Sequence, residues 1–550
     1  MLRFVSMTGR RASAEPPGAV TLSPRWRAGN RWTVFVFVLE AGETFHMNNR
    51  ARWQAIGTGA AAVAVVAGSQ VRPVRGSPTL WPSGDVPSTL TEARISERLW
   101  NISSNTPLNI IVFLALTTLC VAWVQLIREH RAGPTAPRHA VTTAVLWALP
   151  FALGPVMFSR DVYSYAAQGR IVAIGLDPYR VGPLVLGRGS GYVAFVDWTW
   201  MKTPAPYGPL WTKFAGVASA IGGDNPLVSV LLLRLASFAA WAFAGWMIYR
   251  VARRLGSDPM RALLLVTCNP LLIIQAISGV HNDALVLALA LVAVELTLSH
   301  RWRWAALVIG CAASVKMPVI AGLVFLPWAM PGQTARERLR RAAESLLIGV
   351  ATMASIAWAT GLGWGWVDSL RTTGRYTGLM SPLQSLGEVG RDLASVVGIE
   401  ISRSGTESVL ITLGLIVAVG LALVILSRSD RDAPPVALGS ALLAVALLGP
   451  TLYPWYILLP LALMSLSRYQ SKRTAVVVLS VLLTVSAGAD GSTIVSWLGN
   501  TGPWFIPLAA SCVAWWLFRL HRDERRLESR AGTGDPQGDQ FLRPATSRDR

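Results

Sequence analysis

An apolar segment gives way to a polar loop at Phe158-Ser159-Arg160-Asp161-Val162-Tyr163-Ser164-Tyr165-Ala166-Ala167-Gln168-Gly169-Arg170. The preceding run, 140–158, has the length of a membrane-crossing helix. Arg160 and Asp161 therefore lie where the chain leaves the bilayer. Ionisable residues at that depth are costly, and they usually have a function. Asp161 is accordingly the first candidate for a catalytic residue.

The composition is that of a polytopic membrane protein. Of the 550 residues, 52% are hydrophobic and 15% are charged, and the mean hydropathy is +0.44. The net charge of +20 is spread over many short connectors, with no RNA-binding motif and no single basic domain. We therefore interpret the basic residues as topology signals and expect no nucleic-acid partner.

Apolar runs of membrane-spanning length predict an all-α fold with about 13–14 transmembrane helices, and a large outer loop that carries interfacial helices. The expected spans are 54–70, 108–127, 139–158, 226–249, 260–278, 283–299, 304–315, 317–330, 343–361, 407–427, 434–449, 455–467, 474–489 and 503–520. Within the outer loop, 162–174 has the spacing of a helix lying along the membrane surface, with Asp161 near its N-cap. Pro318 allows either two short helices or one kinked span over 304–330.

Basic connectors indicate the orientation. With the first span starting inside, every inner connector is basic, namely 128–138, 250–261, 300–303, 336–341, 428–431 and 468–473. The short outer connectors near 279–283, 449–454 and 489–502 contain no Lys or Arg. The positive-inside rule thus predicts a multi-pass plasma-membrane protein with loop 159–225 outside and a cytoplasmic C-terminus.

Three regions are expected along the chain. Residues 1–52 form an N-terminal extension that is either disordered, a real cytosolic segment or a mis-start, since Met47 directly precedes the first span. Residues 53–520 form the transmembrane domain, and 521–550 form a disordered tail. The four cysteines lie in apolar runs without CxxC spacing, so neither a disulfide framework nor a zinc site is expected.

Polar and aromatic residues collect in the predicted outer loops. They are Arg160, Asp161, Tyr163, Tyr165, Arg170, Tyr207, His281, Asp283, Lys316, Tyr453 and Trp455. Structural alternatives exist for several of them: a helix cap for Asp161 or Asp283, a snorkelling role for Lys316, and an anchoring belt for Tyr453 and Trp455.

Together these residues suggest glycosyl transfer from a lipid-phosphate donor. Cations neutralise a phosphate as it departs, and one carboxylate is enough to deprotonate an acceptor hydroxyl in an inverting displacement. We therefore expect Asp161 to be the base. The expected donor-phosphate ligands are Arg160, Arg170, Lys316 and His281, and the expected substrate contacts are Tyr163, Tyr165, Tyr207, Asp283, Tyr453 and Trp455.

Several motifs resemble the actinobacterial polyprenol-phosphomannose-dependent α-1,6-mannosyltransferases, integral membrane glycosyltransferases of the GT-C class. They are Arg160–Arg170, Gly175-Leu176-Asp177-Pro178-Tyr179, Ala205-Pro206-Tyr207-Gly208-Pro209-Leu210-Trp211, His281-Asn282-Asp283, Lys316-Met317-Pro318 and Tyr453-Pro454-Trp455-Tyr456. The resemblance covers roughly 53–520 and leaves the N-terminal extension unmatched.

This resemblance implies a β-linked polyprenyl-phosphate-mannose donor, inversion to an α-linkage, and a mannan acceptor of lipomannan or lipoarabinomannan type. By the GT-C pattern, the acid at the start of the first large outer loop, here Asp161, is the base. No cofactor is expected, and no divalent metal, because no carboxylates cluster in the sequence. Two other classes remain open: a transporter or flippase of a lipid-linked saccharide, and a non-catalytic membrane scaffold.

Overall fold

The computed structural model describes residues 49–71, 106–328, 330, 332–373, 381–428, 433–489, 491 and 502–532. Predictions for the N-terminal extension up to residue 48, and for the chain after Gly532, lie outside these residues.

Helices account for nearly all regular structure, and these residues contain no β-strand, which confirms the all-α prediction. The first half consists of α1 (Asn49–Gly68), α4 (Thr106–Ala132), α5 (Pro137–Leu153), α6 (Asp161–Ala173), η1 (Pro183–Leu186), α7 (Pro209–Gly222), α8 (Pro226–Arg254), α9 (Pro259–Val266), α10 (Pro270–Ile273), η2 (Ile274–Ser278) and α11 (Asp283–Leu298). The second half consists of α12 (Trp302–Ala313), η3 (Met317–Ala321), α13 (Gly322–Trp328), α14 (Ala335–Thr360), α15 (Trp366–Thr373), α16 (Pro382–Val396), α17 (Arg403–Ser427), α18 (Pro434–Leu448), η5 (Pro454–Ile457), α19 (Leu458–Met464), α20 (Gln470–Val485) and α22 (Gly502–Gly532).

Four helical segments in this part of the chain are long and apolar enough to cross a membrane: Pro107–Ala132, Pro226–Arg254, Ala335–Thr360 and Gly405–Ser427. A fifth is formed by α9 together with α10 and η2, if this pair, bent by 51° at its break, counts as one span. Shorter apolar helices lie beside them, including α12 and α18. The protein is therefore an all-α polytopic membrane protein, and the count of about 13–14 crossings stays a prediction.

The segment 302–328 folds as two short helices rather than as one kinked span. Gly322 in α13 lies against Ile309 in α12, and Leu323 and Gly310 both pack against Gly349 of α14, so the chain turns back on itself. Lys316 stands in the turn with extended backbone angles (φ −150°, ψ 121°). Pro318 occupies the start of η3, where its missing N–H costs no helical hydrogen bond.

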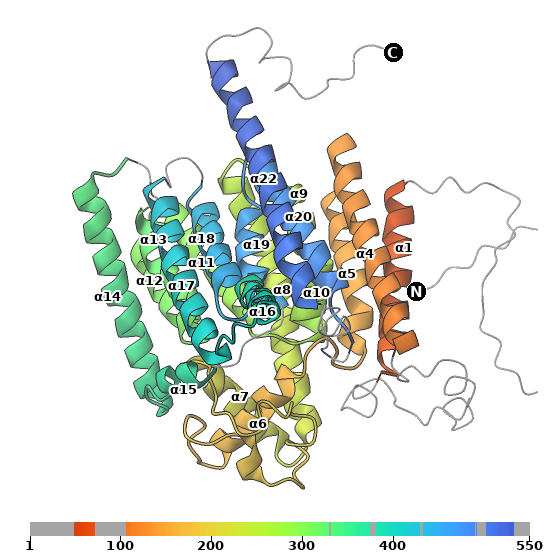
Figure 1. The fold of residues 1–550 in the computed structure, drawn as a ribbon, viewed down its shortest axis with the longest axis vertical. Helices are drawn as coiled ribbons and strands as arrows, with labels where there is room; N and C mark the ends of the chain where they lie inside the picture. The colour runs from red at the N-terminus through yellow and green to blue at the C-terminus, as the bar shows by residue number, and fades with distance from the viewer. Residues whose placement is uncertain are drawn as a thin grey trace, which may run out of the picture. The chain divides into compact units, whose positions relative to one another are not determined.

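The helices α6 and α7, which fall in the loop predicted to lie outside, lie together at one end of the bundle (Figure 1). A Cβ atom at Gly169 of α6 would lie 2.2 Å from the Ala215 carbonyl oxygen of α7, so only glycine permits this close approach. Ser219 of α7 donates a hydrogen bond of 2.9 Å to the Ala166 carbonyl. The pair therefore forms a fixed platform for Asp161, the first residue of α6.

Arg234 of α8 joins two separate segments of the chain. Its side chain is buried and donates to the Phe151 and Gly154 carbonyls at the end of α5, and to the Ile277 carbonyl in η2. Helix ends leave such carbonyls without partners, and an unpaired buried carbonyl is costly. Arg234 thus fixes both the chain that leads to Asp161 and the chain that leads to His281.

α22 continues past His521, where we predicted that a disordered tail begins, to Gly532. Its extension is held at the start of α20. The Glu524 carboxylate accepts hydrogen bonds from the Ser471 hydroxyl (2.7 Å) and the Gln470 backbone N–H (2.5 Å), and His521 contacts Ser471 at 3.2 Å. Tyr469, the N-cap of α20, makes no side-chain cap, so Glu524 supplies the missing acceptor.

The Arg234→Met variant tests this joining role. Removing the guanidinium leaves several buried carbonyls unpaired, and we expect a loss of about 3 kcal/mol in stability. Arg250→Met on the same helix is the control, because Arg250 is 46% exposed and pairs with Glu295 near the surface. Thermal unfolding in detergent should show a much lower midpoint for Arg234→Met alone, and equal midpoints for the two variants would contradict the role.

Candidate active site

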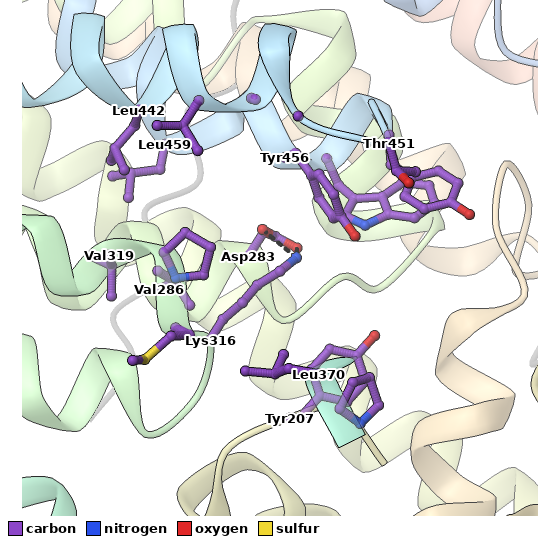
Figure 2. A pocket seen from close by; sticks show the side chains of 18 of the residues that line it. Tyr207, Asp283, Val286, Lys316, Val319, Leu370, Leu442, Thr451, Tyr456 and Leu459 are labelled. Carbon is purple, nitrogen blue, oxygen red and sulfur yellow. Dashed lines mark hydrogen bonds and ion pairs between the residues drawn. The ribbon is translucent and has the colours of Figure 1, made fainter. Parts of the chain in front are cut away.

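A cavity of about 320 Å³ lies beside α6 and reaches into the bundle. Its polar and aromatic lining comprises Asp161, Ser164, Gln168, Trp200, Tyr207, Asp283, Lys316, Thr451, Tyr453, Trp455 and Tyr456. Its apolar lining includes Val286, Val319, Leu415, Leu442, Val445 and Leu459. Figure 2 shows Leu442, Leu459 and Val319 on one side of the Asp283–Lys316 pair, and Tyr456, Thr451 and Tyr207 on the other. One cavity therefore combines a polar end with an apolar end.

Asp161 is the first residue of α6, and Arg160 takes the N-cap position that the sequence suggested for Asp161. The Asp161 side chain is only 13% exposed. Its nearest polar neighbours are the Tyr165 hydroxyl at 3.5 Å and His281 Nδ1 at 3.6 Å. Both contacts are longer than a good hydrogen bond, so the carboxylate is held loosely.

The surroundings of Asp161 change its acidity. Burial raises the pKa of Asp161 to about 7, and the charges of Asp283 and Asp197 add to the rise, while the Lys316 ammonium opposes it. A carboxyl group with a pKa near neutrality exchanges protons readily at physiological pH. It is therefore suited to general-base chemistry.

Lys316 and Asp283 form a buried ion pair inside the same cavity. The Lys316 ammonium donates to both Asp283 oxygens, at 2.8 and 2.6 Å, and the two side chains are 16% and 10% exposed. The ammonium also lies 4.6 Å from the centre of the Tyr456 ring. The sequence suggested Asp161 as the base and Asp283 as a substrate contact, and both acids line the cavity. They differ in role, because Lys316 engages Asp283 fully and leaves Asp161 with longer contacts.

An aromatic stack borders the polar end of the cavity. The His281 ring, which is fully buried, stacks on Trp455 with centres 3.8 Å apart, and Trp455 stacks on Tyr453 with centres 4.6 Å apart. The Tyr165 ring meets Tyr207 edge-on at 5.0 Å. Flat aromatic faces of this kind suit the apolar faces of sugar rings, while their polar atoms serve hydroxyl groups.

Two strained residues precede the site. Phe158 and Val280 adopt left-handed backbone angles, with φ of 67° and 56°, which bulky side chains rarely do. Phe158 is held by a hydrogen bond of 3.0 Å from its N–H to the Ala489 carbonyl. Strain of this kind persists where surrounding contacts enforce it, often beside functional residues. Here it shapes the chain just before Asp161 and His281.

Not every predicted site residue lines the cavity. Arg160 donates to the Phe195 carbonyl (3.0 Å), and the Tyr163 ring packs against Phe195 at 5.4 Å. Arg170 pairs with Asp224 at 2.6 Å. These three residues lie outside the cavity lining, so the predicted phosphate contacts of Arg160 and Arg170 gain no support from the geometry. Tyr165 and His281 do not line the cavity, but both are in contact with Asp161.

Several lining residues were not predicted from the sequence. Ser164 and Gln168 stand three and seven residues after Asp161, so helical spacing places them on the same face of α6. This signal was available, because the helix itself was predicted. Trp200 and Thr451 lie in loops, where no periodic pattern indicates direction.

Fold and site together define a multi-pass membrane protein with a cavity that is polar at one end and apolar at the other. Comparison with known proteins defines the family. Residues 57–332 match the model described as alpha-(1->6)-mannopyranosyltransferase, N-terminal domain, and 384–520 match the MptB C-terminal domain. The chain belongs to this family.

Relatives from mycobacteria and corynebacteria agree. A probable alpha-(1->6)-mannopyranosyltransferase of Mycolicibacterium smegmatis is 32% identical over 475 residues, covering 77% of this chain and 80% of the relative. Alpha-(1->6)-mannopyranosyltransferase A of Mycobacterium tuberculosis is 31% identical, covering 76% of this chain and 83% of the relative. Alpha-(1->6)-mannopyranosyltransferase B of Corynebacterium glutamicum is 29% identical, covering 64% of each chain. No solved structure matches the chain.

A double-mutant cycle tests the buried ion pair. Asp283→Asn and Lys316→Met each leave a buried charge without its partner, and each should cost about 3 kcal/mol. The double variant should cost much less than the sum, since neither charge remains. The measurement is thermal unfolding of the purified protein.

Arg303→Met provides the matched control for this cycle. Arg303 pairs with Glu344 at 3.0 Å but is 65% exposed, so its loss should change the midpoint little. Additive losses for Asp283→Asn and Lys316→Met would show that the two side chains are not coupled.

Proposed function

We propose that this protein transfers mannose from polyprenyl-phosphate-mannose to an α-1,6-linked mannan acceptor of the lipomannan or lipoarabinomannan backbone type. Mannosyl transfer is supported by the family and by its mycobacterial and corynebacterial relatives. The single observation that carries the proposal is the cavity, in which the buried Lys316–Asp283 ion pair separates an apolar region from the Asp161 carboxylate and aromatic faces. Such a cavity suits a ligand made of lipid, phosphate and sugar in that order.

The lipid of the donor is proposed to occupy the apolar end. Val286, Val319, Leu442 and Leu459 offer apolar contacts from four different elements, α11, η3, α18 and α19. A prenyl chain buried there packs its apolar surface closely against these side chains. The donor phosphate then lies near Lys316, at the junction of the two ends.

Lys316 is proposed to hold the phosphate. An ammonium has three N–H donors, and two of them go to the Asp283 oxygens. The third is available for a phosphate oxygen. As the bond between the sugar and the phosphate breaks, negative charge grows on the phosphate, and a positioned ammonium stabilises that charge most in the transition state. Asp283 fixes the direction of the ammonium.

Asp161 is proposed to be the base. It takes the proton from the acceptor hydroxyl, the acceptor oxygen forms a bond to the mannose anomeric carbon, and the phosphate leaves with the bonding electrons. The leaving phosphate needs no proton, so one carboxylate completes the reaction. Inversion follows from a single displacement of this kind.

We further propose that the cavity opens to the outer side of the membrane. His281, Lys316 and Tyr453 each lie next to one end of a helical segment. The basic stretches 250–261, 336–341 and 468–473 lie at the other ends of these segments. The positive-inside rule puts such basic connectors in the cytoplasm. The C-terminus would then be cytoplasmic.

The Asp161→Asn variant tests the proposed base. The amide keeps the shape of the side chain and removes its ability to accept a proton, so transfer should fall by roughly 10³-fold or more. Asp224→Asn is the matched control, because Asp224 is 97% exposed and lies outside the cavity. Transfer from radiolabelled polyprenyl-phosphate-mannose to a short α-1,6-mannoside measures the effect, and near-normal turnover of Asp161→Asn would exclude the assignment.

The pH dependence gives a second test. Because burial raises the pKa of Asp161 to about 7, the carboxyl group is protonated and inactive below that pH and ionised above it. The value of kcat/KM should rise with pH through about 7 and then level off. Residual activity of Asp161→Asn should lose this rise. A wild-type profile that is flat between pH 5 and 8 would contradict the role.

A further inference from the structure

A second cavity, of about 560 Å³, is lined by residues of the segment 184–202, which begins in η1 and ends before α7. Its lining combines the aromatic side chain of Trp198, the cations Arg188 and Lys202, the hydroxyl of Thr199, and apolar residues such as Val193 and Met201. Trp198 is 80% exposed, an unusual state for so large an apolar side chain. Exposed aromatic residues beside a hollow are typical of ligand-binding grooves.

One short segment of chain, 198–202, forms part of the wall of both cavities. Trp200 lines the catalytic cavity, while Trp198, Thr199 and Lys202 line the second. Asp197, the residue before Trp198, is also near enough to Asp161 to contribute, after burial and the nearer charges, to the raised pKa of Asp161. The segment that contains Asp197 and Trp198 therefore lies near Asp161 and borders the second cavity at the same time.

Hydrogen bonds hold this wall in one conformation. The Leu184 N–H donates to the Met201 carbonyl (2.8 Å), and the Thr199 N–H donates to the Asp197 carboxylate (2.9 Å). Arg160, next to Asp161, donates to the Phe195 carbonyl three residues before Trp198. The loop that carries Trp198 is thus tied to the start of α6, and a preformed surface binds a ligand at lower entropic cost.

We propose that this second cavity is a subsite for the acceptor glycan, in which a hexose ring stacks on Trp198 while Arg188 and Lys202 donate hydrogen bonds to sugar hydroxyls. The inference deepens the proposed function and rests on it. The subsite holds acceptor sugars remote from the reacting hydroxyl, so it favours longer acceptors over short ones.

A different use of Trp198 would be anchoring in the membrane interface, where Trp, Arg and Lys are common. The observations favour the glycan. Anchoring requires neither a cavity beside the ring nor a wall shared with the site that holds Asp161, and both are present. Trp358, which is 84% exposed near the end of α14 and lines neither cavity, has the character of an anchor and serves as the control.

The test compares acceptors of two lengths. Wild-type protein, Trp198→Ala, Trp198→Phe and Trp358→Ala are assayed in proteoliposomes with an α-1,6-mannobioside and an α-1,6-mannotetraoside. Trp198→Ala should raise KM for the tetraoside by about tenfold, because it loses one aromatic stacking contact. Its kcat, its KM for the donor and its KM for the bioside should stay unchanged. Trp198→Phe should retain most of the preference, and Trp358→Ala all of it.

A second variant, Arg188→Ala with Lys202→Ala, should reproduce the length-dependent effect. Equal KM changes for both acceptors, or none, would overturn the subsite. If the activity lost in Trp198→Ala depended on the lipid composition of the vesicles and not on acceptor length, Trp198 would be a membrane anchor. That result would also overturn the subsite. If the wild-type protein were inactive with every mannoside, the proposed function itself would be contradicted. This result is distinct from failure of the subsite, because it is seen without any variant.

Discussion

The site depends on one buried arginine. Arg234 donates to carbonyls at the end of α5 and in η2, and these two segments carry the chain to Asp161 and to His281. A guanidinium in a membrane helix is expensive unless its donors are used. Here they are used to cap helix ends that would otherwise leave polar groups unpaired in an apolar environment. Ser237, nearly one turn further along α8, adds a hydrogen bond of 2.6 Å to the Ala276 carbonyl. The same helix therefore fixes two loops that are far apart in the sequence.

The site also depends on a difference between its two carboxylates. Asp283 is neutralised by Lys316 at 2.6 Å, whereas Asp161 is buried among aromatic rings with only longer polar contacts. Burial of a carboxyl group raises its pKa, and a close cation opposes that rise. Two acids in one cavity can therefore serve as a fixed orienting group and as a proton acceptor. Under the proposed function, Asp283 aims the ammonium at the phosphate while Asp161 acts on the acceptor.

Much of the fold and part of the site were predictable from the sequence. Apolar run lengths predicted the helices, and Pro318 allowed the short hairpin of α12 and α13. The alternation of basic loops predicted that Asp161, Asp283 and Lys316 lie on the same side of the membrane. Side-chain partners were not predictable, because they depend on which loops meet in three dimensions. Arg160 and Arg170 were expected near a phosphate, yet the structure pairs them with the Phe195 carbonyl and Asp224. The Lys316–Asp283 pair and the carbonyls around Arg234 leave no pattern in the sequence.

We propose that this protein forms an α-mannosidic bond at the cavity that holds Asp161 and Lys316. The most direct measurement uses the purified protein in liposomes that contain β-linked polyprenyl-phosphate-[¹⁴C]mannose, with an α-1,6-mannotrioside outside. We expect a labelled tetrasaccharide whose label is released by α-mannosidase. Label that crosses the bilayer without joining the acceptor, or a product resistant to α-mannosidase, would contradict it.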